Sequence, residues 1–229
     1  MRKHLIKKVY CCAIALAVIA AATWGISARG SYTDVTSEAG YLDGFVVAEM
    51  SEASCAVACE DMYASLDGSP VIVQVTCTGD IEHLFAASQQ RVVVDKVFKG
   101  EGLSEGDEIY LTSSRWRVIY RDSYMDSLHA IERGFVNILK QEEKYLAFIS
   151  AKVAESDGRP VYMLSDVENV APVFCYEDAQ NVIVPVPLGN TYVPYSDVRD
   201  NEFFVTSQES LDMILGLKDE FIQKYPISK

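Results

Sequence analysis

Ser104 is the residue whose spacing most resembles a catalytic motif. It lies within residues 102–106 (GLSEG), which have the G-x-S-x-G spacing of a hydrolase nucleophile elbow. That elbow requires a strand before the serine and a helix after it. Here the residues form a glycine-rich acidic turn between two predicted strands, residues 91–98 and 109–112. We therefore interpret the match as accidental.

The histidines and carboxylates of the sequence are not spaced as in a known catalytic or metal-binding motif. His83 and His129 are the histidines that remain after the basic N-terminus, and lone histidines of this kind usually lie on the surface. Asp197, Asp200 and Glu202 fall in one predicted loop and are candidate calcium ligands, because calcium prefers oxygen ligands, although they lack the alternating pattern of a calcium loop. A carboxylate hydrolase would need two acids that converge in a cleft, one of them with a raised pKa.

Four cysteines lie outside the N-terminal apolar segment: Cys55, Cys59, Cys77 and Cys175. An even number of cysteines in an exported domain suggests disulfides, and four cysteines permit three pairings. Cys55 and Cys59 share one face of a predicted helix, so we expect each to pair with a distant strand, one with Cys77 and one with Cys175. Zinc is disfavoured, because the spacing lacks paired ligands and histidines near them.

Trp116 and its neighbours form the candidate binding residues. Arg115 and Arg117 flank Trp116, and Tyr120 follows in the same predicted strand. Aromatic side chains beside polar ones can form a platform for a ligand. Packing of Trp116 in the core is the alternative, and we favour it because aromatic residues dominate cores. The two arginines are a basic spot on an acidic protein, which predicts an anionic partner there.

Residues 1–30 predict a signal peptide or a signal anchor. Four basic residues precede residue 9 and no acid does, and residues 9–26 are an apolar run of 18 residues. That length is at the lower limit for a membrane span. We favour a retained anchor, since only Thr23 is polar before Ser27, although residues 20–22 offer small residues for cleavage. Either interpretation predicts that the later residues lie outside the cell membrane, tethered or secreted.

The charge of the exported part excludes one class of partner. The whole chain carries −13, and the first 28 residues carry four positive charges, so the remainder carries −17. Such a surface repels nucleic-acid phosphates. The sequence therefore predicts a protein or cell-envelope partner, no nucleic acid and no cofactor. About 200 residues suffice for one domain with extensions.

The patterning predicts an α+β domain. Residues 31–44 form a polar stalk, residues 45–205 the β-rich domain with a leading helix, and residues 206–226 a C-terminal helix. The predicted helices are residues 45–66, 124–140 and 206–226, and the predicted strands are residues 71–77, 91–98, 109–112, 115–120, 144–153, 160–164 and, as an edge segment, 182–186. Residues 78–90 are expected to be a polar connection.

The C-terminal helix carries the clearest helical pattern. Thr206 and Glu209 have the spacing of a capping box, and Pro226 ends the segment. One stripe of the helix is apolar and consists of Leu211, Ile214, Leu215, Phe221, Ile222 and Tyr225.

A resemblance follows from the strand segments. Residues 69–73 (SPVIV), 92–100 (VVVDKVFKG), 106–109 (GDEI) and 144–149 (KYLAFI) resemble small exported bacterial domains with an OB-type barrel, similar to the netrin-like fold of metalloproteinase inhibitors. The resemblance covers residues 69–165 and implies five short antiparallel strands, with a helix between the third and fourth. Netrin-like inhibitors act through a free N-terminal cysteine, and this chain has no exported cysteine before Cys55, so inhibitor function is not implied.

Three functions are therefore compatible with the sequence. The expected one is a non-enzymatic binding module outside the membrane. The alternatives are a carboxylate-based envelope hydrolase and an assembly protein whose C-terminal stripe docks a partner. An exposed stripe would support the assembly role, and a buried one would count against it.

Overall fold

The computed structural model describes residues 2–30, 40–84, 87–123, 126–153, 158–185 and 192–227, of which residues 2–12, 28–30, 119–123 and 126–128 are described by their backbone alone. The chain divides into two compact units, Met1–Tyr41 and Leu42–Lys229. The first unit contains the helix α1 (Arg2–Gly30).

The predicted membrane segment falls in α1. Within the residues whose side chains are described, no helix is both long enough and apolar enough to cross a membrane. The predicted segment, residues 9–26, lies partly outside those residues. Most of the predicted stalk, residues 31–44, also lies outside the described residues, and its end forms the 3-10 turn η2 (Tyr41–Gly44).

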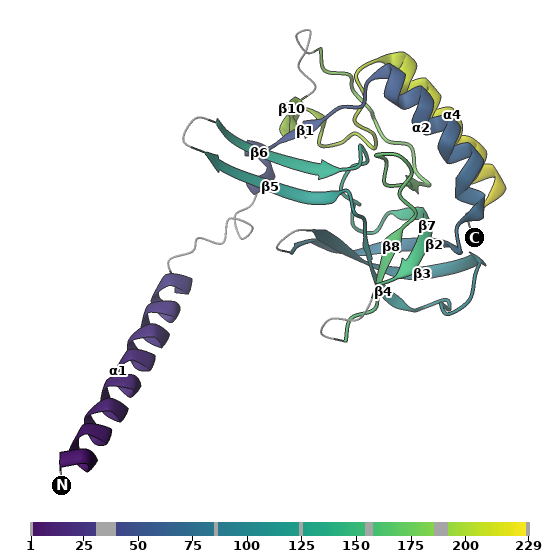
Figure 1. Cartoon of the computed structure of the whole chain (residues 1–229). Helices are drawn as coiled ribbons and strands as arrows, with labels where there is room; N and C mark the ends of the chain where they lie inside the picture. Colours follow the sequence, from purple (N-terminus) through teal and green to yellow (C-terminus); the bar gives the residue numbers. More distant parts are fainter. Residues whose placement is uncertain are drawn as a thin grey trace. The chain divides into compact units, whose positions relative to one another are not determined.

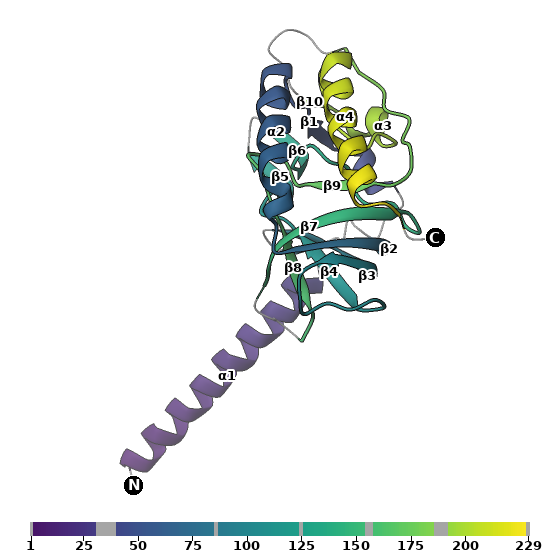
Figure 2. The ribbon, with the colours of Figure 1, turned by 90° about the vertical axis from the view of Figure 1, so that its right-hand side faces the viewer.

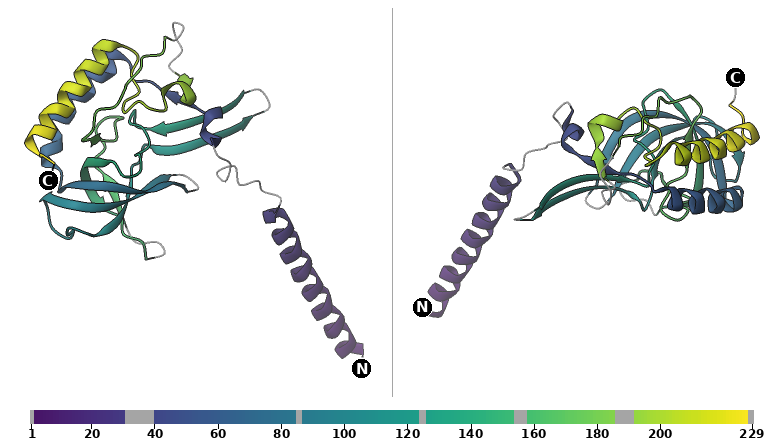
Figure 3. Two further views of the ribbon diagram at one scale, coloured as in Figure 1. Left: turned by 180° about the vertical axis from the view of Figure 1, so that it is seen from behind. Right: turned by 90° about the horizontal axis from the view of Figure 1, so that it is seen from above.

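A four-stranded sheet forms one part of the second unit. Its order is β10 (Tyr192–Pro194), β1 (Val46–Ala48), β6 (Asp126–Arg133) and β5 (Trp116–Ser123). β1 runs antiparallel to β10 and parallel to β6, whereas β5 and β6 form an antiparallel hairpin. This hairpin extends away from the rest of the unit, on the side opposite α2 and α4 (Figures 1 and 3).

A six-stranded sheet forms the other part. Its order is β2 (Val71–His83), β3 (Ser88–Lys99), β4 (Glu108–Thr112), β8 (Val161–Leu164), β7 (Lys144–Lys152) and β9 (Val173–Cys175). β2 also pairs with β7, so the pairings β2-β3-β4-β8-β7-β2 form a closed circuit. β4 and β8 are parallel, and the other pairs are antiparallel. Ile72 and Val73 point to opposite faces and are both fully buried, so β2 is covered on both faces.

Two long helices lie side by side and complete the unit (Figures 1 and 2). α2 (Glu52–Ser65) continues into the 3-10 turn η3 (Leu66–Gly68), and α4 (Gln208–Lys224) follows the short α3 (Tyr195–Val198). The ring of Phe221 in α4 lies 5.1 Å from that of Phe148 in β7, which places the helix against the strands.

The α+β class is confirmed, and the strands predicted at residues 71–77, 91–98, 109–112, 115–120, 144–153 and 160–164 appear as β2, β3, β4, β5, β7 and β8. The predicted polar connection is mostly strand, because β2 extends to His83 and β3 begins at Ser88. The edge segment predicted at 182–186 has no strand among its described residues, 182–185.

The helix predicted over residues 124–140 is wrong. Its described part contains β6, which pairs along its length with β5. Leu, Ala, Glu and Arg favour helix locally, but strand pairing overrides this preference. The helix predicted from Phe45 begins instead at Glu52, because Ser51 caps it by accepting a hydrogen bond from the N–H of Ser54.

The C-terminal helix is confirmed with a different cap. Ser207, rather than Thr206, caps α4 by accepting a hydrogen bond from the N–H of Ser210. Leu211, Ile214 and Phe221 of the predicted stripe are buried, while the remaining members, Leu215, Ile222 and Tyr225, are partly buried. The apolar stripe therefore packs within the unit.

Candidate functional site

Arg133 is the most unusual buried side chain of the described structure. It ends β6 opposite Trp116 of β5, so both side chains lie on one face of the hairpin. Arg133 is 2% exposed, and its Cζ lies 3.5 Å from the centroid of the fully buried Trp116 ring. Its Nη2 donates to Oε1 of Gln90 at 2.8 Å, and its Nη1 donates to Oγ of Ser88 at 3.3 Å.

Arg133 carries its charge without a carboxylate. Both hydrogen-bond acceptors are neutral, and none of the ion pairs among the described residues includes Arg133. Burial lowers the pKa of Arg133 to about 9, which leaves the guanidinium protonated at neutral pH. Buried charges are normally paired. Within the described part of the chain, no carboxylate therefore neutralises Arg133.

Three N–H donors at the base of the hairpin have no acceptor in the described part of the chain. They are Nε of Arg133, Nε1 of Trp116 and Nε of Arg115. Leaving a buried donor unsatisfied costs about 1–3 kcal/mol. Native structures accept such a cost where a water molecule, an ion or a functional group enters.

A pocket of about 150 Å³ lies at this place, and we name it the arginine pocket. It is lined by Ala48, Arg115, Ile131, Glu132, Arg133, Gly134, Phe135, Asn169 and Phe204. Arg115 is partly buried and donates from Nη2 to the carbonyl oxygen of Glu168 at 3.1 Å. The acid in the lining, Glu132, lies 3.6 Å from Nε of the exposed Arg117. The arginine pocket is therefore lined by two cations and one already paired acid.

The structure separates the residues that the sequence grouped together. Trp116 is fully buried and offers no surface platform, whereas Arg115 lines the arginine pocket. Arg117 is exposed and pairs with Glu132 across the hairpin. The side chain of Tyr120 lies outside the described residues.

Sequence reasoning missed Arg133 because the segment around it was interpreted as helix. His129, Ile131 and Arg133 alternate with Leu128, Ala130 and Glu132, and Ile131 is buried. Strand alternation alone would not have placed Arg133 in the interior either, because Ala130 and Ile131 point to opposite faces and both are buried.

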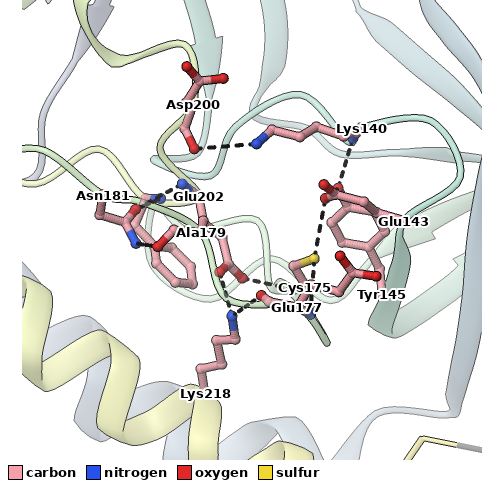
Figure 4. A network of polar contacts seen from close by, with 11 residues as sticks. Lys140, Glu143, Tyr145, Cys175, Glu177, Ala179, Asn181, Asp200, Glu202 and Lys218 are labelled. Carbon is pink, nitrogen blue, oxygen red and sulfur yellow. Dashed lines mark hydrogen bonds and ion pairs between the residues drawn. The ribbon is translucent and has the colours of Figure 1, made fainter.

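A second polar cluster surrounds Cys175 (Figure 4). The thiol of Cys175 donates to Oε2 of Glu143 at 3.4 Å, and the hydroxyl of Tyr145 donates to the same oxygen at 3.0 Å. The N–H of Cys175 donates to Oε1 of Glu202 at 2.8 Å, and Nζ of Lys218 donates to Oε2 of Glu202 at 2.6 Å. These residues tie β7, β9, the segment before α4 and α4 itself together.

The residues of this cluster stabilise the fold and are not arranged for catalysis. Burial raises the pKa of Cys175 to about 12, so the sulfur remains a protonated thiol and a poor nucleophile. Burial also raises the pKa of Glu202, while Lys218 opposes this effect. The adjoining cavity measures about 40 Å³, which is enough for a water molecule and too small for a substrate.

The four cysteines lie in α2, β2 and β9. All four are free thiols, and Sγ of Cys55 lies 3.9 Å from Sγ of Cys59. The face of α2 that carries them is turned toward α4, where Cys55 donates to the carbonyl oxygen of Ser210 at 3.3 Å. Cys77 and Cys175 lie on strands that flank opposite sides of β7. The structure has no disulfide among these four cysteines, and the helix-to-strand pairing stays a prediction.

The histidines and the loop acids do not form a metal site. His83 lies near Arg133, and burial and the Arg133 charge both lower its pKa. The ring of His129 lies 5.4 Å from that of Phe45. Glu202, a proposed calcium ligand, is paired with Lys218. Among the residues that the structure describes, no group of three metal-ligating side chains occurs.

Comparison with known protein families finds no family that matches this chain, and comparison with curated proteins finds no matching relative.

Proposed function

We propose that this protein is a non-enzymatic binding module outside the cell membrane, tethered by residues 9–26 or released, whose arginine pocket receives an anionic group of a protein or cell-envelope partner. One observation carries the proposal: Arg133 is a buried positive charge that has no carboxylate partner among the described residues and lines a pocket. In a low-dielectric surrounding, such a charge produces a strong positive potential in the adjacent space.

The fold that presents the pocket supports a binding role. We infer that the circuit β2-β3-β4-β8-β7 is an OB-type barrel, because OB folds are five-stranded Greek-key barrels and the circuit also has five strands. The netrin-like resemblance belongs to the same proposal. The helix expected between the third and fourth barrel strands is replaced by the β5–β6 hairpin, and this hairpin carries Arg115, Trp116 and Arg133.

Titration with acetate tests the proposal, since acetate is a minimal carboxylate. In a W24F background Trp116 is the single tryptophan, so its emission reports on Arg133. We expect a saturable change in emission, and affinity about tenfold lower in R133M and in R115M. R199M is the matched control and should bind like the parent, because Arg199 is exposed, pairs with Asp43 and does not line the arginine pocket. Equal affinity in all four proteins would contradict the proposal.

The carboxylate hydrolase has less support, because Glu143 and Glu202 both accept hydrogen bonds from Cys175 but the adjoining cavity of about 40 Å³ is too small for a substrate. Two converging acids are the arrangement such an enzyme needs. Release of reducing sugar from envelope glycan that is lost in E143Q and kept in E142Q would support the hydrolase. The assembly role is weakened by the burial of Leu211, Ile214 and Phe221.

A further inference from the structure

A second hollow adjoins the arginine pocket. It measures about 320 Å³ and is lined by Met50, Ala53, Ser54, Val57, Ala58, Phe135, Glu168, Asn169 and Val170. Phe135 and Asn169 also line the arginine pocket, so the two hollows meet at these residues. We name the second hollow the α2 groove. A ligand that extends past Phe135 and Asn169 would contact both hollows.

The α2 groove has an apolar floor and a polar rim. Six of its nine lining residues are apolar, and Ser54, Glu168 and Asn169 are polar. Its α2 wall includes Ala53 and Ala58, whose small side chains leave space, and Val57, which is 54% exposed. An exposed apolar side chain in a groove gains free energy when a ligand covers it.

The junction of the two hollows has a strained backbone. Phe135 has φ +58° and Glu168 has φ +51°, and both are non-glycine residues in the left-handed region. The carbonyl oxygen of Phe135 accepts from the N–H of Phe204 at 2.9 Å, and that of Glu168 accepts from Arg115. Strained residues held by such contacts are common where a protein clamps a ligand.

We infer that the two hollows together bind the C-terminal end of a peptide whose last residue is apolar, an inference that rests on the proposed function. The terminal carboxylate occupies the arginine pocket, opposite Arg115 and Arg133. The last side chain covers Val57 in the α2 groove. The main-chain amides of the peptide lie along the rim, where Ser54 and Asn169 supply polar groups.

The lining favours a peptide over a fatty acid. A fatty acid would place only methylene groups against the exposed Ser54, Glu168 and Asn169, and would offer no hydrogen bond in place of the water that it displaces there. A peptide end satisfies both parts of the surface, because it carries one charge, one apolar side chain and several hydrogen-bonding groups within a few bonds.

Calorimetric titration of the full chain with four small probes tests the inference: acetate, N-acetyl-leucine, N-acetyl-leucinamide and dodecanoate. We expect N-acetyl-leucine to bind about tenfold more tightly than acetate, because its side chain covers apolar surface. The leucinamide has no carboxylate and should bind at least tenfold more weakly than N-acetyl-leucine.

The helix α2 offers a matched pair of variants that tests the groove. A53F fills the α2 groove and should abolish the advantage of N-acetyl-leucine while leaving acetate binding intact. A64F places the same side chain at an exposed position of α2 outside the groove and should change neither.

The outcomes separate the inference from the proposed function. Acetate binding without any advantage for N-acetyl-leucine would overturn the peptide inference and leave the anion site standing. Equal binding of the acid and the amide, or tighter binding of dodecanoate than of N-acetyl-leucine, would also overturn it. Failure of every carboxylate to bind would overturn both.

Discussion

Single buried charges are the features of this protein that demand the most explanation at the residue scale. Arg133 lies in the interior with neutral acceptors and the Trp116 ring as its neighbours. Stacking on a tryptophan contributes about 2 kcal/mol when the cation is desolvated. This stabilisation offsets part of the cost of burial, but it does not replace a counterion. The proposed ligand supplies the missing negative charge.

Glu49 gives a prediction for the pH dependence of stability. It is 3% exposed, both of its carboxylate oxygens lack partners among the described residues, and burial raises its pKa from 4.5 to about 7. Between these pH values the folded state holds a proton that the unfolded state releases. The free energy of unfolding should therefore fall by up to about 3 kcal/mol as pH rises from 4.5 to 7, and should not change further through this group above pH 7.

Urea unfolding at pH 5 and pH 7.5 measures this effect. In E49Q the difference in free energy of unfolding between the two pH values should be smaller by most of that amount. E60Q changes an exposed glutamate of α2 and should retain the wild-type difference. The same pH difference in E49Q and wild type would show that Glu49 does not titrate in this window.

At the scale of elements, the ion pair Lys218–Glu202 attaches α4 to the strands. Both side chains are almost fully buried, 3% and 5% exposed. K218M leaves the Glu202 carboxylate buried without its cation, which should lower the free energy of unfolding by about 3–5 kcal/mol. The double variant K218M/E202Q should recover part of this loss. Urea unfolding measures both.

K224M is the control for this pair. Lys224 lies on the same helix and pairs with Asp67, but both side chains are largely exposed, so the loss should be below about 1 kcal/mol. Equal losses in K218M and K224M would mean that burial does not decide the strength of these pairs.

The turn after β6 gives a second prediction for an element. Gly134 has φ +62°, and a Cβ there would lie 2.6 Å from the backbone nitrogen of Ala171. G134A should therefore lower the free energy of unfolding by about 2–4 kcal/mol through strain and overpacking. Gly158 has φ +72° with open space around it, so G158A should cost only about 1 kcal/mol. Equal losses of stability in G134A and G158A, measured by thermal unfolding, would show that the close contact with Ala171 does not contribute.

The β5–β6 hairpin marks the limit of what the sequence predicts about the fold and the site. The alternating residues 71–77 predict β2 and the apolar run at residues 145–149 predicts β7, although both strands are buried on both faces. Sequence patterning fails for β6, where helix-favouring residues form a strand only because β5 and β1 pair with it. Arg115 could be found from its type, whereas Arg133 could be found only after the hairpin was known.

At the scale of the whole molecule, an acidic protein presents a small cationic pocket. The chain carries −13, yet Arg115 and Arg133 meet in one hollow lined by a single acid, Glu132. An acidic surface disfavours polyanions such as nucleic acid over long distances. A single carboxylate on a small ligand experiences mainly the local charge of the pocket. The overall charge and the pocket thus select together for small or singly charged groups.

A crystal structure of the protein grown in sodium formate is the most direct test of this account. We predict a formate ion in the arginine pocket, within hydrogen-bonding distance of Arg133 or Arg115, and its absence from crystals of R133M grown in the same way. Wild-type crystals in which the pocket holds only water while formate occupies other sites would contradict the central claim.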